Sequence, residues 1–371
     1  MLADVVESTI GAAYLHGGVH LGYVACAFFE LGLKNWHPLS HRYGQVLSQL
    51  DAAQDLPLAV VQNVESMLGY TFKHKILLVE ALTHASCETN HGTVSYERLE
   101  FLGDSVLDMV VTDYLYRAPG KNYSPGHIHL RRSALVNAHT LAYFCLRCSV
   151  TIQSSMAHPD DEGSIVLESE DNDIYLWKCL LHSSSRVMED QATTFARFQK
   201  QKNSVEEAMT SGGIFPWAAL VRLQAPKFFS DMIESLIGAT FLDSEGSMDA
   251  AKGVMRRLGI LQLMERIVKD DVDVLHPVSR LSMWATNADK KLEYKFPREK
   301  GNITCIVTAG GDELASETDV YRGRATQEEV KFAAAETAVR SLRLRTGRKE
   351  DLDFVKKRKR KAKSTTAKSE S

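Results

Sequence analysis

The chain has 371 residues, of which 44% are hydrophobic and 25% are charged, and its formal net charge at pH 7 is −3. This composition is typical of a soluble chain with two or three domains. The most apolar early run, residues 21–33, is too short to cross a bilayer and contains Glu30, and no signal-peptide pattern stands at the start, so we expect an intracellular protein. Six scattered cysteines fit a reducing compartment.

The first predicted element is a helix whose pattern returns much later in the chain. Residues 4–15 and 231–242 both read D-x-x-E-S-x-I-G-A-x-x-L. A chance pair of helical acids is the alternative, but the small residues and the spacing match as well. We therefore interpret the pattern as an internal repeat, whose first copy has no matching segment before it. Helix-breaking residues at 36–39 and 55–57 end this part of the chain.

Helical spacing of apolar residues returns after the second breaker. The helices that we expect cover residues 58–68, 76–85, 97–116 and 124–148. Gly69 is the expected C-cap of the first of these helices, and Ser95 is the expected N-cap of the third. Because no strand alternates with these helices, an all-α domain is predicted.

The third of these helices carries acidic residues inside an apolar run. Glu97, Glu100 and Asp104 fall at i, i+3 and i+7, which places them on one face. Carboxylates that repel one another and lose hydration are costly unless a hard divalent cation or a basic partner neutralises them. A second pair, Asp231 and Glu234, has the same spacing in another apolar helix. A solvated acidic face is the alternative for a single pair, but two pairs favour a shared metal site.

Residues 150–223 interrupt the helical pattern. Acidic and polar runs at 158–163 and 168–173 are typical of solvated loops, with a partner-binding site as the alternative. Short helices are expected at 174–181 and 205–209, and the apolar residues that follow 213 are expected to dock on the core.

Beyond residue 276 the sequence changes to a smaller mixed fold. A helix over 278–287 is followed by three alternating strands and a final helix over 325–344, with Gly310, Gly311 and Asp312 as a hairpin turn. The basic block at 356–363 is read with three alternatives: a nuclear import signal, a phosphate-binding arm or a disordered solubilising end.

Four of these segments resemble the ribonuclease III family. The sequence ERLEFLGD at 97–104 is similar to the family signature, and ALTHAS at 81–86 is similar to a helix that precedes it. SALVN at 133–137 and the acidic segment at 226–239 follow in the family order, the latter in the form found in Dicers. The four motifs together identify a resemblance that covers about residues 58–260.

The resemblance implies a domain organisation. It implies a ribonuclease III domain at 58–262 with an insertion at about 150–223, and it identifies residues 1–50 as similar to the tail of a first such domain, since Dicers carry two in tandem. Residues 274–346 resemble a double-stranded RNA-binding domain, and 347–371 form a basic tail. The fold class that we expect is therefore mainly α, with an all-helical nuclease domain followed by a small α-β-β-β-α domain.

The resemblance also implies roles for individual residues. The four metal ligands are expected to be Glu100, Asp104, Asp231 and Glu234. Glu97 is expected to assist from the rim. Lys227 either lies beside the acids, where it pairs with a scissile phosphate or balances the carboxylates, or stands in solvent at the start of a helix. Asn137 either lies near the acids or bonds only to the backbone.

The C-terminal domain departs from the pattern of RNA-binding domains that it resembles. Where those domains have paired lysines at the start of the last helix, this chain has Gln327 and Glu328, and only Lys331 remains on that stripe. We therefore expect the fold of such a domain but a weaker hold on RNA.

The resemblance implies an endonuclease that depends on Mg²⁺ or Mn²⁺ and cleaves double-stranded RNA. The wider role that it implies is the production of small RNAs for gene silencing. Two nuclease domains must face each other to cut both strands, so we expect a homodimer or pairing with a second ribonuclease III domain. No membrane partner is expected. Two alternatives are a catalytically silent RNA-binding module and a protein-interaction fragment.

Overall fold

The computed structural model describes residues 2–31, 56–88, 93–159, 165–299, 301–318 and 326–344. It divides into two units, residues 1–49 and 50–371. In the first unit α1 (Leu2–Phe28) is interrupted at Gly17 and Gly18, whose backbone angles are not helical. The rest of the predicted remnant and the basic tail lie outside the described residues. Among the described helices, none has the length and apolarity needed to cross a membrane.

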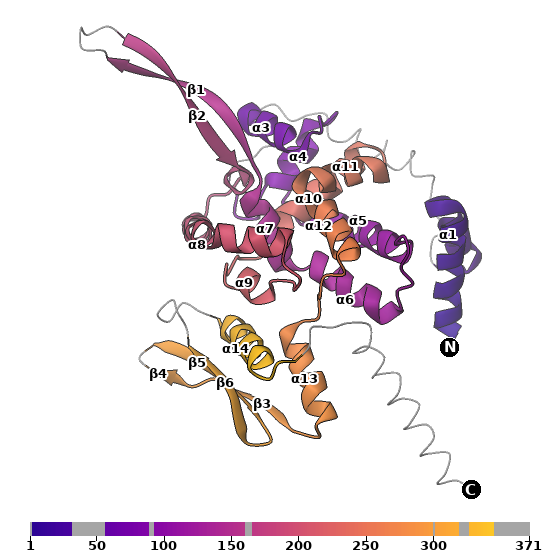
Figure 1. The fold of residues 1–371 in the computed structure, drawn as a ribbon. Helices are drawn as coiled ribbons and strands as arrows, with labels where there is room; N and C mark the ends of the chain where they lie inside the picture. Colours follow the sequence, from indigo (N-terminus) through magenta and orange to yellow (C-terminus); the bar gives the residue numbers. More distant parts are fainter. Residues whose placement is uncertain are drawn as a thin grey trace. The chain divides into compact units, whose positions relative to one another are not determined.

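The second unit is built around a central helix, α10 (Phe228–Asp243), nearly all of whose residues are buried. The other helices of its larger part are α3 (Leu58–Leu68), α4 (Lys75–Leu82), α5 (Glu97–Tyr116), α6 (Pro125–Leu135), α7 (Ala138–Arg147), α8 (Ser185–Thr210), α9 (Trp217–Val221), α11 (Met248–Leu258) and α12 (Ile260–Lys269). Helices α4, α5, α7 and α11 pack directly on α10 (Figure 1). The mainly α fold class is confirmed, and Gly69 is the left-handed C-cap of α3 as predicted.

One helix expected at 124–148 is two helices, α6 and α7. Ser124 caps α6 and Pro125 is its first residue, as the sequence suggested. Asn137 starts α7, since its side-chain oxygen accepts from the Thr140 amide at 3.0 Å and its amide nitrogen donates to the Ser133 carbonyl at 2.9 Å. Asn137 therefore bonds to the backbone, as one of the two alternatives required, but its amide nitrogen also donates to Thr140 Oγ1 at 2.9 Å.

Of the two runs expected to be acidic loops, the run at 168–173 is instead part of a long antiparallel hairpin, β1 (Ser149–Pro159) paired with β2 (Ile165–Tyr175). Residues 160–163 of the other run lie outside the described residues. The hairpin extends away from the helices (Figure 1). The short helix expected at 174–181 is wrong, because its start belongs to β2 and only a 3₁₀ turn, Leu176–Cys179, follows. The short helix expected at 205–209 is the end of the much longer α8.

The smaller part of the unit has a helix, then strands, then a helix, as predicted, but with four strands in place of the three expected. It consists of α13 (Pro277–Asn287), β3 (Leu292–Lys295), β4 (Arg298–Glu299), β5 (Asn302–Ala309), β6 (Asp312–Thr318) and α14 (Gln327–Ser341). All strand pairings are antiparallel, with β5 bonded to β3, β4 and β6. Gly310 and Gly311 form the expected turn with positive φ. The two-residue β4 was not foreseen.

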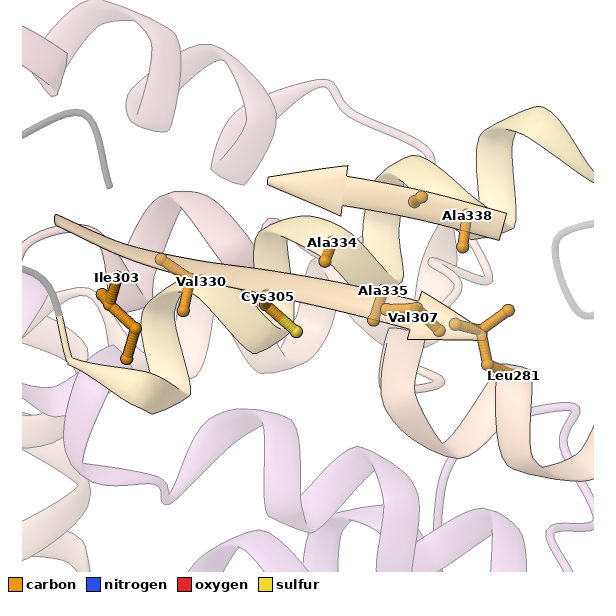
Figure 2. Packing of buried hydrophobic residues seen from close by; sticks show 9 residues of the cluster. Leu281, Ile303, Cys305, Val307, Val330, Ala334, Ala335 and Ala338 are labelled. Carbon is orange, nitrogen blue, oxygen red and sulfur yellow. The ribbon is translucent and has the colours of Figure 1, made fainter. Parts of the chain in front are cut away.

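Alternate residues of β5 and one face of α14 form the core of this part. Figure 2 shows Ile303, Cys305 and Val307 of β5 on the side that faces α14, and all three are at most 4% exposed. The alanines of α14 and Leu281 of α13 close the other side. The strict alternation of buried and partly exposed positions along β5 is what a sheet with one covered face requires.

Candidate metal centre

Two glycines let α5 and α10 cross with their backbones in contact. A Cβ atom on Gly103 would lie 1.7 Å from the carbonyl oxygen of Glu234, and one on Gly238 would lie 2.1 Å from that of Leu99. Any larger residue at either position would hold the helices apart. Because both acidic pairs lie next to this crossing, the contact brings the carboxylates of α5 and α10 together.

The crossing joins three of the predicted acids. Glu100 of α5 and Asp231 and Glu234 of α10 each offer a carboxylate oxygen, and these oxygens lie within 4.8 Å of one another. Asp231 is only 5% exposed, and the other two are half-buried. Oxygen donors that converge in this way suit a hard cation such as Mg²⁺ or Mn²⁺. The arrangement therefore fits the metal that the sequence led us to expect.

Glu234 has an unusual electrostatic environment. Its burial, together with the negative charges of Asp104 and Asp231, raises its pKa from 4.5 to about 8. Burial, and the nearby charge of Glu100, also raise the pKa of Asp231, although its bond to Lys227 opposes them. The site thus disfavours a negative charge on Glu234, and a bound cation would offset that cost.

Lys227 lies beside the acids and not alone in solvent. Its ammonium group donates to Asp231 Oδ1 at 2.7 Å and also contacts Glu100 Oε1. Burial alone would lower the pKa of Lys227, but the bonds to these two carboxylates raise it, so the side chain is charged. The side chain as a whole remains largely accessible, with 67% of it exposed. Lys227 therefore balances the carboxylates from the solvent side.

Asp104 and Glu97 lie at the edge of the cluster. Asp104 is close enough to raise the pKa of Glu234, but its oxygens are outside the group of three, so its role as a metal ligand stays a prediction. Glu97 is exposed and accepts a hydrogen bond from Ser95 Oγ at 3.1 Å. That bond replaces the helix cap predicted for Ser95, because the N-cap residue of α5 is Tyr96.

Tyr96 is a site residue that the sequence analysis missed. Its side chain is 6% exposed, and its hydroxyl donates to Asp231 Oδ2 at 3.2 Å. The Oδ1 atom of the same carboxylate is held by Lys227, so both oxygens of Asp231 have partners. The only indication of a functional role in the sequence is the position of Tyr96 directly before Glu97. An aromatic residue at such a position is usually interpreted as part of the hydrophobic core.

An ion pair between a buried glutamate and an exposed arginine fixes the start of α5 on α4. Glu80 of α4 is fully buried, and both its carboxylate oxygens accept from Arg98, one of them from Nη2 at 2.6 Å. Ser235 of α10 donates to the carbonyl of Ala81 at 2.7 Å, which ties the third helix to the same place. Three helices therefore set the positions of the carboxylates.

We expect Tyr96→Phe to weaken Mn²⁺ binding by about tenfold, because a side chain that orients a metal ligand typically contributes that much to affinity. Isothermal titration of the purified chain measures the effect. Tyr116→Phe makes the same change on the exposed end of the same helix and is expected to bind Mn²⁺ like the unmodified chain. Equal affinities for all three proteins would show that Tyr96 does not position Asp231.

Comparison with known proteins agrees with the motifs. Residues 97–245 match the family model described as the ribonuclease III domain. "Dicer-like protein 2" of Coccidioides immitis is 34% identical over 348 residues, which is 93% of this chain and 24% of that protein. "Dicer-like protein 2" of Aspergillus oryzae is 35% identical over 277 residues, 75% of this chain and 20% of that protein. The chain thus spans about a quarter of the length of these relatives.

Two solved structures also show low structural similarity to this chain. The nuclease domain of ribonuclease III from Campylobacter jejuni is 27% identical, covers 56% of this chain and 96% of its own, and has a TM-score of 0.32. Dicer from Pichia stipitis is 18% identical, covers 72% of this chain and 94% of its own, and has a TM-score of 0.26. The resemblance to the ribonuclease III family therefore rests on the sequence matches.

Proposed function

Because the chain carries a ribonuclease III domain and is similar to the C-terminal part of fungal Dicer-like proteins, we propose that it is a metal-dependent endonuclease that cuts double-stranded RNA into small RNAs for silencing. The observation that carries the proposal is the convergence of Glu100, Asp231 and Glu234 at the crossing of α5 and α10. Carboxylate clusters of this kind serve phosphodiester hydrolysis.

Glu100, Asp231 and Glu234 would hold Mg²⁺ or Mn²⁺, with Asp104 completing the set and Glu97 assisting from the rim. A bound ion lowers the pKa of water and neutralises charge on the scissile phosphate. The chain itself supplies orientation, since Tyr96 and Lys227 each hold one oxygen of Asp231. The largely exposed side chain of Lys227 is also placed to pair with a phosphate oxygen once a cation takes over the carboxylates.

The pKa of Glu234 predicts how metal binding depends on pH. With a pKa of about 8, its carboxyl holds a proton at pH 7 in most metal-free molecules, and a metal ligand must lose that proton. We expect binding at pH 7 to release about one proton per ion and affinity to rise up to about pH 8. Titrations in buffers of different ionisation enthalpy measure this release. Its absence in the unmodified chain would contradict the assignment of Glu234.

Cutting both strands requires two nuclease domains, and we propose that this chain pairs through α5. Phe101, next to Glu100, is 78% exposed, and Tyr116 at the other end of the helix is 59% exposed. Aromatic side chains are enriched at interfaces, and the exposed Phe101 lies directly beside the carboxylate cluster. The partner would be a second copy or another ribonuclease III domain.

We expect Phe101→Ser to weaken self-association at least about tenfold, because a buried aromatic anchor commonly dominates an interface. Sedimentation velocity over a range of concentrations gives the dissociation constant. Met188→Ser, which removes a 61% exposed side chain from α8, is the matched control and is expected to have no effect. A strictly monomeric chain that still cuts both strands efficiently would refute pairing.

Incubation of the purified chain with long double-stranded RNA, with and without Mg²⁺, tests the function as a whole. We expect cleavage only with the metal. RNA that is bound but never cut would favour the catalytically silent module, and neither binding nor cleavage would favour the protein-interaction fragment.

A further inference from the structure

The segment that connects the nuclease domain to the C-terminal domain is anchored and not a free tether. Asp273 donates its amide to the carbonyl of Gly213 at 3.0 Å and accepts from the amide of Phe215 at 2.9 Å, as in a short parallel strand pair. The carboxylate of Asp273 pairs with Arg280 of α13, and both side chains are 7% exposed. The connection is therefore held at both ends.

A stack of rings continues this anchor from one domain to the other. His276 lies between Trp217 of α9, at 4.9 Å between ring centroids, and Phe332 of α14, at 4.2 Å. Trp217 also donates its indole N–H to the carbonyl of Val274 at 3.2 Å. Burial of His276 in this stack lowers its pKa to about 4, so the ring is neutral and packs as an aromatic group.

The acidic first turn of α14 faces the nuclease domain. Glu329 is 4% exposed, and its carboxylate accepts a hydrogen bond from the side-chain amide of Gln224, which follows α9. Gln224 has a φ of 48°, a conformation rare for residues other than glycine. Glu328 Oε2 lies 3.9 Å from His139 Nε2 at the start of α7. Both glutamates therefore contact residues of the nuclease domain.

Lys331, the one lysine left on the stripe of α14, is also engaged. Its ammonium lies 5.0 Å from the centre of the Tyr294 ring of β3, and the side chain is half-buried. Positive charge near a phosphate backbone supplies most of the affinity of nucleic-acid binding. The first turn of α14 instead presents two acids, the half-buried Lys331 follows it, and the more buried acid, Glu329, is bonded to Gln224.

We propose that the first turn of α14 is a docking surface for the nuclease domain of the same chain and not a contact for RNA. The C-terminal domain is then a fixed part of the nuclease, held through Gln224, His139 and the ring stack. Any RNA contact of this domain uses another face. That the turn does not contact RNA rests on the proposed function, whereas its docking on the nuclease domain does not depend on that function.

Exchanging the two partners of the buried hydrogen bond tests the docking. Gln224→Glu places two carboxylates face to face, and Gln224→Glu with Glu329→Gln restores an amide–carboxylate pair in the opposite sense. Hydrogen exchange of the full chain, without RNA, reports on the amides of Phe215 and Asp273. We expect exchange at least about tenfold faster in the single variant, because a bond to a charged group is lost, and a return toward the original rate in the double variant.

The second claim, that the first turn of α14 does not contact RNA, is tested by measuring the binding of double-stranded RNA in Ca²⁺ at several salt concentrations. We expect Glu329→Gln to leave affinity and its salt dependence unchanged, as for the control Glu336→Gln on the far part of α14, where Glu336 pairs with Arg340. If the amides of Phe215 and Asp273 exchange at the original rate in Gln224→Glu, the docking proposal is overturned. If Glu329→Gln binds RNA more tightly and with a steeper salt dependence, the first turn of α14 contacts RNA. A chain that binds no RNA would contradict the proposed function while the exchange data still decide docking.

Discussion

Glu234→Gln is expected to slow RNA cleavage at least about a thousandfold while RNA remains bound. The substitution keeps the shape of the side chain but removes a charged ligand from the group of three oxygens. A metal ion in such a site contributes several kcal/mol to transition-state stabilisation, and each 1.36 kcal/mol is a factor of about ten in rate. Single-turnover cleavage of a labelled duplex, with a parallel binding assay in Ca²⁺, separates the two effects.

The same substitution is expected to stabilise the metal-free protein, which distinguishes lost chemistry from misfolding. The folded-state pKa of Glu234, about 8, is above its unfolded value of 4.5, so the folded state binds more protons between these pH values and stability falls as pH rises through them. Glutamine does not ionise, so the variant avoids this loss of stability. Its gain in free energy of unfolding over the unmodified chain therefore grows from pH 4.5 and is complete above about pH 8. Urea unfolding at pH 5 and pH 8.5 measures it.

A matched substitution supplies the control for the rate. Glu265→Gln in α12 removes a carboxylate that pairs with Arg256 on the exposed side of the molecule. We expect it to cut RNA at the rate of the unmodified chain. If Glu234→Gln cuts RNA at that rate as well, the carboxylates do not form the catalytic centre.

The acids of the site could be predicted because their chemistry depends on spacing along helices. Glu100 with Asp104, and Asp231 with Glu234, lie one turn apart inside apolar runs, and the structure joins three of them. Tyr96 could not be predicted, because its role comes from the way α5 meets α10, which brings its hydroxyl to a residue 135 positions away. Local pattern carries no information about such a bond.

In the insertion at 150–223, the local sequence pattern predicted the wrong secondary structure. The acidic residues of β2 read as loop because their charge exceeds their apolar content, yet the hairpin needs only backbone pairing and the apolar residues near its base. The buried residues of α8 lie on one face, but two of them are polar and a polar run at 199–204 separates the last two from the others: Val187, Gln191, Thr194, Phe198, Val205 and Met209. A narrow apolar stripe of this kind is too sparse for a helix of this length to be recognised from periodicity.

Gly238→Ala is expected to destabilise the larger, helical part of the second unit by about 3 kcal/mol or more and to abolish metal binding. The added methyl would lie 2.1 Å from the Leu99 carbonyl oxygen, and the neighbouring atoms are backbone that cannot turn aside. The helices must therefore separate, which moves Glu100 away from Asp231 and Glu234. Urea unfolding followed by circular dichroism gives the stability, and Mn²⁺ titration gives the loss of the site.

Gly253→Ala isolates this steric effect from the general preference of helices for alanine. Gly253 lies on the exposed side of α11, and a Cβ atom there meets nothing within 4 Å. This change is expected to stabilise the protein by about 0.5–1 kcal/mol and to leave Mn²⁺ affinity intact. The two glycine-to-alanine changes would then alter the free energy of unfolding in opposite directions. The difference between them would measure how much the close crossing of α5 and α10 contributes to stability. Equal effects would show that the carboxylates are not brought together by this contact.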